Sequence, residues 1–308
     1  MQLKGKKVLV TGGAGFIGSH TVDALIKEGA KVMVVDNLST GRKENLNPKA
    51  KFYKLNIKSP KIEEIIKKEK PEIVYHFAHF VLVPKSVKNP LLDMDCLIGT
   101  IRILKSLTEI KNFKKFVMAS SGFLYGNTKH RPTKETEPIS PISPYVVTKK
   151  AIENYLEFYK QTYGIPRVIL RYPGVYGPRQ ITGAMADYIR KLSTNKQAEI
   201  WGDGKKTRDY IFIEDVVRAN IVALDLKDNY SNPVFNVGTG IETTLNELYF
   251  KIAKKLNKKA SPIYYPDRKG EQVRYSLDAS KIKKELGWSY KISLEEGLEK
   301  TLKYWKLI

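Results

Sequence analysis

A glycine-rich turn near the start of the chain limits what the first half of this sequence can fold into. The apolar run Lys7–Thr11 has the composition of a buried strand, and it leads directly into Thr11-Gly-Gly-Ala-Gly-Phe-Ile-Gly18. Glycines in such a turn allow a sharp bend, close approach of a pyrophosphate and close packing of the next helix on the strand. The N–H groups that open this helix would face the phosphates. The turn therefore predicts a dinucleotide site at Gly12, Gly15, Phe16, Ile17 and Gly18.

An acidic residue at the end of the next apolar run indicates which dinucleotide is bound. Asp36 ends the predicted strand Lys31–Asp36, near the spacing from the glycines at which a carboxylate binds a ribose. A carboxylate accepts hydrogen bonds from a ribose 2′-hydroxyl and repels a 2′-phosphate. Arg42 and Lys43 come after the acid and do not replace it. We therefore predict NAD rather than NADP as the cofactor.

Strands and helices alternate along the rest of the first half. Further buried strands are expected at Phe52–Ile57, Ile73–Phe77, Phe116–Ser120 and Val168–Tyr172. Helices are expected between them at Ile17–Glu28, Ile62–Lys68, Leu91–Thr108 and Tyr145–Tyr163. This alternation predicts an α/β fold with a Rossmann-type, doubly wound parallel sheet over residues 1–173.

The rhythm changes after about Gly174, where glycines and prolines separate shorter elements. Helices return at Glu214–Leu224, Leu245–Leu256 and Ser293–Trp305. We expect residues 174–308 to form mainly a smaller α/β substrate-binding lobe, with some segments returning to the first domain.

Charge and composition narrow the classes of partner. The chain carries 54 Lys and Arg against 32 Asp and Glu, a net charge of +22, which suits either a polyanion-binding protein or a dispersed lysine-rich surface. No block of five or six like charges appears, so we favour the dispersed surface and expect no nucleic-acid partner. No apolar run reaches the ~20 residues of a membrane helix. The first residues lack a signal-peptide pattern, and Cys96 is the single cysteine, so we expect a soluble, cytoplasmic protein without disulfides. The four histidines have no metal-ligand spacing, and no metal is expected.

Three residues in the first half form a candidate catalytic group. Tyr145 and Lys149 stand four apart at the start of a predicted helix, which places them on one face. A tyrosine has a pKa of about 10, and a nearby ammonium favours the phenolate. Lys149 is therefore expected to lower the pKa of Tyr145 and to reach a cofactor ribose. Ser121 ends a predicted strand, where α/β sheets place ligand-contacting residues. Each feature alone is common, and the combination in this order is specific.

Taken together, these motifs resemble the extended short-chain dehydrogenase/reductases, most closely the UDP-glucose 4-epimerases and their N-acetylhexosamine relatives. The resemblance covers nearly the whole chain. Besides the residues above, it is carried by Val35–Gly41, Leu124–Gly126, Ser143-Pro144-Tyr145, Arg171–Tyr172, Val175–Gln180, Gly202–Gly204, Thr207–Tyr210, Asn236–Gly240 and Arg268–Glu271.

The resemblance implies roles for particular positions. Ser121, Tyr145 and Lys149 match the catalytic triad. The cofactor site would also include Asn37, Asn56, Ile57, Phe77, Ala78 and Tyr172. The substrate site would include Ser121, Tyr145, Gly174, Trp201 beside the uracil, Arg208 and Arg268 on the diphosphate, Glu271 on the uridine ribose, and Tyr275 beside the sugar C2 substituent or packed on the lobe surface. The pattern departs from its relatives at Cys96, Asn56, His79, Pro173-Gly174 and Lys206, and the stretch after Gln180 is shorter.

The expected activity is that of a UDP-glucose/UDP-galactose 4-epimerase, an isomerase that transiently oxidises the sugar. Tyr145 would take the proton of the 4-hydroxyl while hydride passes from C4 to NAD and later returns to the other face. The alternatives are epimerisation of UDP-N-acetylhexosamines, a nucleotide-sugar 4,6-dehydratase, and a noncatalytic nucleic-acid-binding relative. Gly122 and Phe123 stand where dehydratases carry Asp-Glu, and they cannot transfer protons. Relatives often dimerise through two long helices, here Leu91–Thr108 and Tyr145–Tyr163, so a homodimer is expected.

Overall fold

Seven parallel strands form the central sheet of the computed structural model, which describes residues 1–79, 83–259, 261–267 and 272–308. The strand order is β11-β6-β5-β4-β1-β2-β3. The strands are β1 (Lys7–Thr11), β2 (Lys31–Asp36), β3 (Lys51–Lys54), β4 (Ile73–His76), β5 (Lys115–Ser121), β6 (Arg167–Tyr172) and β11 (Val234–Asn236). Because all of them run the same way, their carboxyl ends meet along one edge of the sheet.

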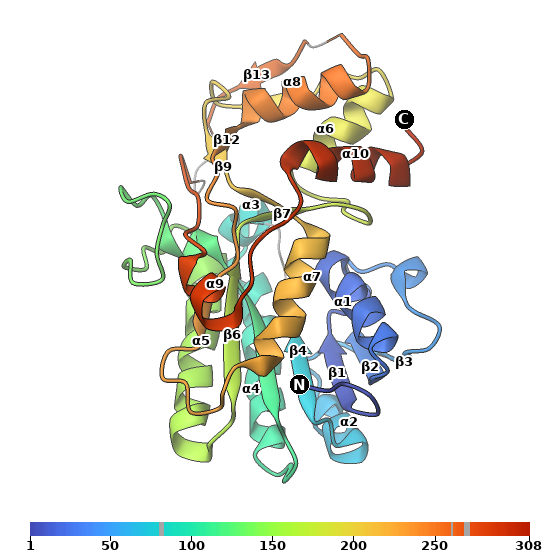
Figure 1. Ribbon diagram of the computed structural model, residues 1–308, viewed down its shortest axis with the longest axis vertical. Coiled ribbons are helices and arrows are strands. Elements are labelled where there is room, and N and C mark those ends of the chain that lie inside the picture. Colours follow the sequence, from blue (N-terminus) through green and yellow to red (C-terminus); the bar gives the residue numbers. More distant parts are fainter. Residues whose placement is uncertain (80–82, 260, 268–271) are drawn as a thin grey trace.

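Helices cover both faces of this sheet (Figure 1). Successive residues of each strand point to opposite faces, so the strands feed two separate apolar clusters. On one face the sheet packs against α1 (Phe16–Lys27) and α7 (Ile213–Val222). On the other it packs against α2 (Lys61–Glu69), α4 (Met94–Leu107) and α5 (Pro144–Tyr163). This is the predicted Rossmann-like arrangement, and it confirms the fold class.

The second half builds a smaller layer over the carboxyl edge of the sheet, at the top of Figure 1. Helix α9 (Ser280–Leu286) lies lower, beside the sheet, where it contacts β11. The helices of the smaller layer are α6 (Ala184–Ser193), α8 (Leu245–Lys255) and α10 (Leu294–Tyr304). Its strands pair two by two: β7 (Gly174–Tyr176) with β10 (Tyr210–Phe212), β8 (Glu199–Trp201) with β13 (Ile263–Tyr265), and β9 (Thr207–Arg208) with β12 (Thr243–Thr244). The remaining short elements are α3 (Val83–Lys88) and 3-10 helices at Lys43–Asn45, Pro90–Asp93, Gly122–Tyr125 and Ala223–Asp225.

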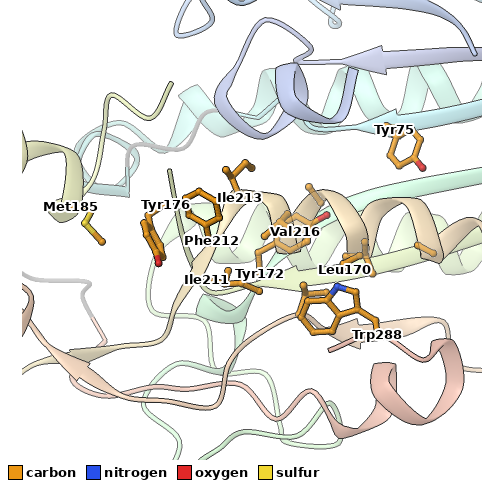
Figure 2. Packing of buried hydrophobic residues seen from close by; sticks show 14 of the residues in the cluster. Tyr75, Leu170, Tyr172, Tyr176, Met185, Ile211, Phe212, Ile213, Val216 and Trp288 are labelled. Atoms are coloured by element: carbon orange, nitrogen blue, oxygen red, sulfur yellow. The ribbon is translucent and has the colours of Figure 1, made fainter. Parts of the chain in front are cut away.

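One continuous core joins the two halves. Figure 2 shows Leu170 and Tyr172 of β6 in the same cluster as Tyr176 of β7, Met185 of α6 and Val216 of α7. Trp288, 2% exposed, extends this cluster toward the C-terminus, and its indole N–H donates to the Asp215 carbonyl at 3.0 Å. Burying a side chain of this kind stabilises the fold by roughly 1.5–3 kcal/mol.

Most predicted elements are present, and the differences have local causes. The third strand ends at Lys54 instead of Ile57, because the Asn56 side chain accepts from the Lys58 amide at 3.0 Å and turns the chain. The helix expected at Leu91–Thr108 begins as the 3-10 turn Pro90–Asp93 and becomes α-helical only at Met94. Helices α6 and α9 were not predicted at all.

The division of the chain at residue 173 stays a prediction. The structure places β11 beside β6 and packs α7 on α1, so segments from the second half contribute to the first-half sheet and its cover. None of the helices in the described part of the chain is long and apolar enough to cross a membrane.

Candidate active site

A large pocket runs along the carboxyl edge of the sheet beneath the smaller layer. Its volume is about 1210 Å³, which exceeds the roughly 300–1,000 Å³ of a site for one small ligand. Every residue predicted for the site lines this pocket, apart from Arg268 and Glu271, which lie outside the described residues. The pocket can therefore hold two ligands end to end.

The glycine turn and Asp36 form one end of the pocket. Asp36 ends β2 and is 7% exposed, with its carboxylate accepting from the Ala14 amide at 3.0 Å and the Leu38 amide at 2.8 Å. Burial raises the pKa of this carboxyl, and the two amide hydrogen bonds oppose that rise. A carboxylate has lone pairs left after two such bonds. Asp36 is thus fixed in place and still able to accept from a ribose.

The glycines of the turn satisfy steric demands that other residues would violate. A Cβ on Gly12, whose φ is +71°, would lie 2.7 Å from the Ala78 amide nitrogen. A Cβ on Gly18 would lie 2.2 Å from the Gly12 carbonyl oxygen. Gly15 precedes α1 and lines the pocket at the start of that helix. The turn, the helix start and Asp36 fit the pyrophosphate and ribose of NAD.

Ser121, Tyr145 and Lys149 meet at the middle of the pocket. Ser121 ends β5, and Tyr145 and Lys149 lie in the first turns of α5. All three are at least nine-tenths buried. The Ser121 hydroxyl hydrogen-bonds the Tyr145 phenol, and its oxygen also accepts from the Phe123 amide at 3.2 Å. The trio has the composition for moving a proton to or from a buried hydroxyl.

A buried ion pair behind the trio holds β5, α5 and β6 together. Glu153 of α5 accepts from the Ser120 hydroxyl at 2.7 Å and from Arg171 of β6 at 2.7 and 3.0 Å. Arg171 also donates to the Tyr125 hydroxyl at 2.8 Å. Because Ser120 precedes Ser121, and Glu153 lies one turn past Lys149, this network fixes the spacing of Ser121 and Lys149.

The predicted electrostatic effect of Lys149 on Tyr145 is wrong in its net direction. Burial raises the pKa of Tyr145 to about 12, and the Ser121 hydrogen bond only partly offsets this. Burial also lowers the pKa of Lys149 to about 8. The Lys149 ammonium donates to the Ala119 carbonyl at 2.7 Å and lies 6.0 Å from the tyrosine ring centroid. Burial is therefore the largest cause of the Tyr145 shift, and the charge effect predicted from the spacing is not among its causes.

The other end of the pocket is aromatic and basic. Tyr275 is 1% exposed and packs on Phe123 with ring centroids 5.3 Å apart. The Arg208 guanidinium lies 5.8 Å from the Tyr275 ring centroid and 5.9 Å from that of Phe123. Trp201 stacks on Tyr265 at 5.1 Å. Arg208 and the stacked rings have the chemistry to bind a diphosphate and a base.

Two loops of this end are tied together by Asp209. Its fully buried carboxylate accepts from the Thr239 hydroxyl at 2.6 Å and from the amides of Thr239, Gly240 and Leu277 at 3.1 Å. Asp209 follows Arg208, and Leu277 lies two residues past Tyr275. The motifs around Asp209 and Gly238 therefore position the binding residues.

Gly174 is one of the positions at which the sequence departs from its relatives. It lines the pocket, but a Cβ there would lie 2.9 Å from the Asp209 carbonyl oxygen and 3.2 Å from the Tyr210 ring. The Gly174 amide donates to the same Asp209 carbonyl at 2.9 Å. In this chain the close pairing of β7 with β10 requires the glycine.

Several pocket residues were not predicted as site residues. They include His79, Cys96 and Phe123, together with Leu92, Asp95, Ser39, Thr40, Gln180, Tyr188, Arg190, Lys191, Glu199 and Tyr210. His79 follows the end of β4 by three residues, a position that strand-end reasoning covers. Within the described ranges, no group of three or more His, Cys, Asp or Glu side chains is arranged to hold a metal ion.

Comparison with known proteins agrees with this geometry. The family model described as GDP-mannose 4,6 dehydratase matches residues 9–301. A putative UDP-glucose 4-epimerase from Methanocaldococcus jannaschii is 41% identical over 305 residues, covering 97% of this chain and 98% of the relative. A crystal structure of UDP-glucose 4-epimerase with UDP-glucose from Thermotoga maritima is 43% identical, with a TM-score of 0.93 and coverage of 97% and 98%. A crystal structure of UDP-glucose 4-epimerase with NAD from Thermus thermophilus is 34% identical, with a TM-score of 0.91, and the match covers 97% of this chain and 99% of that one. The chain therefore belongs to the family that the GDP-mannose 4,6 dehydratase model describes, within the extended short-chain dehydrogenase/reductases.

Proposed function

We propose that this protein is an NAD-dependent UDP-sugar 4-epimerase that interconverts UDP-glucose and UDP-galactose. The observation that carries the proposal is the meeting of Ser121, Tyr145 and Lys149 in one pocket, between the Asp36 end and the Arg208 end. Relatives of similar length and architecture are UDP-glucose 4-epimerases, and solved ones are described with NAD or UDP-glucose.

In the proposed reaction the protein moves one proton and orients one sugar. Tyr145 accepts the proton of the sugar 4-hydroxyl, and the Ser121 hydroxyl stabilises the oxygen that loses it. NAD, held at the Asp36 end of the pocket, would supply the hydride acceptor for C4 and the hydride donor for the opposite face of the ketone. Lys149 binds the cofactor ribose and supplies positive charge near the phenol. Arg208 holds the diphosphate while the sugar turns over. The cycle consumes nothing, because the proton and the hydride both return to the sugar.

The 4,6-dehydratase alternative lacks its acid and base at the expected positions. Gly122 and Phe123 follow Ser121 in a 3-10 turn. A Cβ on Gly122 would lie 2.9 Å from the Leu277 side chain, and Phe123 packs on Tyr275. Neither can transfer a proton to or from C5 or C6 of a sugar. Both reactions begin with hydride transfer from C4, and we therefore propose epimerisation instead of dehydration.

The choice between plain and N-acetylated sugars rests on Tyr275. The ring is buried and lines the pocket, so it does not pack on the outer surface of the lobe. We propose that it occupies space beside the sugar. A side chain of this size leaves less room for a C2 N-acetyl group than a small one. UDP-glucose and UDP-galactose are the proposed pair, and the UDP-N-acetylhexosamines are the alternative.

Incubation of the purified protein with UDP-glucose, with ¹H NMR of the anomeric signals, tests the proposal. We expect UDP-galactose to accumulate to a constant ratio, and the same ratio to be reached from UDP-galactose. Tyr145→Phe is the matched control, because it removes only the phenol oxygen. Formation of a 4-keto-6-deoxy sugar instead would assign the dehydratase reaction.

We further propose a homodimer formed through α4 and α5, in the cytoplasm. The two helices lie side by side (Figure 1), and they carry large exposed apolar side chains. These are Met94 and Ile98 on α4, Leu91 just before it, and Val147 and Phe158 on α5. Sedimentation analysis of wild type and Ile98→Glu tests this, with a shift to monomer expected for the variant. Cytoplasmic location is supported by the single, buried and unpaired Cys96.

A further inference from the structure

A buried histidine packs directly against the ring of the proposed catalytic tyrosine. The His79 imidazole meets the Tyr145 ring edge to face, with centroids 4.9 Å apart and planes at 81°. The His79 side chain is 1% exposed, and Tyr145 is 8% exposed. Such a contact restricts the ring of Tyr145 on the side it covers.

The imidazole has a close partner at one ring nitrogen and a buried carboxylate near the other. Its Nδ1 lies 2.8 Å from Sγ of Cys96, which also contacts the Ala78 carbonyl at 2.9 Å. Its Nε2 lies 3.5 Å from Oδ1 of Asp93, a fully buried carboxylate whose other oxygen accepts from the Ser86 hydroxyl. His79 therefore lies between the Tyr145 ring and the buried carboxylate of Asp93.

This arrangement differs from an ordinary core histidine elsewhere in the chain. His76 is also buried, but its two nitrogens pair with the hydroxyls of Thr11 at 2.8 Å and Thr100 at 2.9 Å. Neutral hydroxyls satisfy that ring. His79 instead joins a carboxylate to the tyrosine, and both Nε2 of His79 and Oδ1 of Asp93 lack a well-formed hydrogen bond within the described residues.

The buried carboxylate contributes to the charge around the phenol. The titratable or hydroxyl groups that face Tyr145 from the surrounding elements are Ser121 at the end of β5, Lys149 on α5, Cys96 on α4, Asp93 at the end of the 3-10 turn, His79 after β4, and Tyr275. Negative charge on Asp93 raises the pKa of Tyr145 and opposes the lowering of the pKa of Lys149. Asp93 therefore opposes the phenolate and favours cationic neighbours.

We propose that His79 and Asp93 form a positioning pair that orients the Tyr145 ring and places a fixed negative charge behind it. The proposal rests on the proposed function only in so far as Tyr145 is the proton acceptor. His79 acts through the shape of its ring, and Asp93 acts through its charge and by holding His79. Neither is required to touch the sugar. The pair therefore makes two separable predictions.

The ring contact is tested by two substitutions of the same residue. His79→Ala removes the contact, and we expect kcat for UDP-glucose to fall on the order of 10-fold, with KM changed less than about 2-fold, since misplacing a catalytic group costs rate more than binding. His79→Phe keeps a planar ring and should recover most of the lost kcat. Wild-type kcat in His79→Ala, or an equal loss in His79→Phe, would overturn the positioning role of the ring.

The charge is tested by Asp93→Asn, which keeps the size of the side chain and leaves no buried charge unpaired. Tyrosine labelled with ¹³C at Cζ is incorporated, and the signal missing from Tyr145→Phe identifies Tyr145. In protein saturated with NAD and without any sugar, the ionisation midpoint of Tyr145 should move to lower pH by about half a unit or more in Asp93→Asn. An unchanged midpoint would overturn the electrostatic role.

A matched histidine–carboxylate pair on the surface is the control. His130 lies 3.0 Å from Glu137, and its side chain is 78% exposed. His130→Ala and Glu137→Gln should leave both kcat and the Tyr145 midpoint unchanged, and an effect as large as that of the buried pair would refute a specific role. If the unmodified enzyme fails to turn over UDP-glucose, the proposed function falls, while the titration of Tyr145 still decides the charge.

Discussion

The ammonium of Lys149 lies 6.0 Å from the centroid of the Tyr145 ring, and it donates to the Ala119 carbonyl at 2.7 Å. The two residues share one helix face, yet the ammonium is held by the end of a strand. Lys149 is thereby held against β5, where it lines the pocket. Burial raises the pKa of Tyr145, and Lys149 is not among the causes of that shift.

Removing the phenol oxygen should stop turnover without emptying the cofactor site. In Tyr145→Phe the ring keeps its contact with His79, so the pocket should retain its shape. We expect kcat to fall at least ~100-fold, the low end for loss of a general base. Turnover by NMR and NAD content by absorbance of the heat-denatured supernatant give the two readouts. Near-normal turnover would exclude Tyr145 as the base.

Asp36 should decide between the two dinucleotides. Its carboxylate is held by the Ala14 and Leu38 amides, so it cannot swing away from a 2′-phosphate. Asp36→Ala removes the negative charge, and the preference for NAD over NADP should weaken. Competition binding of both nucleotides to wild type and variant measures this. Wild-type protein that binds NADP as tightly as NAD would contradict the assignment.

Lys149 should lower the stability of the fold at neutral pH. Burial lowers its pKa to about 8, below the ordinary value of 10.5, so the charged form is disfavoured in the folded state. Between about pH 8 and 10.5 the unfolded chain still binds this proton while the folded chain does not, and the free energy of unfolding rises with pH. Below about pH 8, Lys149 is charged in both states, and the full free-energy cost of burying its charge lowers the stability of the fold.

Lys149→Met should therefore raise the free energy of unfolding at pH 7 by on the order of 1–3 kcal/mol. Loss of the hydrogen bond from Lys149 to the Ala119 carbonyl reduces this gain. Urea unfolding of both proteins at pH 7 and pH 10 measures the difference, which should shrink at the higher pH. The variant should be inactive. If the difference in free energy of unfolding between the two proteins increases with pH, the burial of a charged Lys149 does not lower the stability.

Tyr275 should set the preference between sugars. The ring is buried between Phe123 and Arg208, so it has little room to move aside. Overpacking of this kind costs perhaps ~1–3 kcal/mol, or roughly 5- to 150-fold in discrimination. Tyr275→Ser should raise kcat/KM for UDP-N-acetylglucosamine relative to UDP-glucose. If wild type already prefers the N-acetylated substrate, the enzyme belongs to that branch.

The sequence predicted every strand of the sheet except β11, together with fewer than half of the residues that line the pocket, because these features follow short-range patterns. Continuous apolar runs predicted the strands, and parallel strands bring Asp36, Ser121 and Tyr172 to one edge. Helix α6 was missed although Met185, Tyr188, Ile189 and Leu192 have helical spacing, because the surrounding glycines suggested irregular structure. That signal was available in the sequence.

Other features depend on packing that no local pattern encodes. The contacts of Asp209 join residues thirty and more positions apart. Strand β8 pairs with β13, which lies far along the chain, beyond α8. The direction of the Tyr145 pKa depends on how much water the completed pocket excludes. The Tyr145–Lys149 spacing fixes a helix face, but the degree of burial is a property of the whole fold.

The position of β11 has a consequence for how the chain is made. This strand pairs with β6, and the Ile169 amide donates to the Pro233 carbonyl at 2.8 Å. A nascent chain therefore carries β6 with one open, hydrogen-bonding edge until residues 234–236 leave the ribosome. Such an edge is a template for pairing with other chains. We expect chains that stop before β11 to aggregate during synthesis, and the complete sheet to form only after most of the protein has been translated.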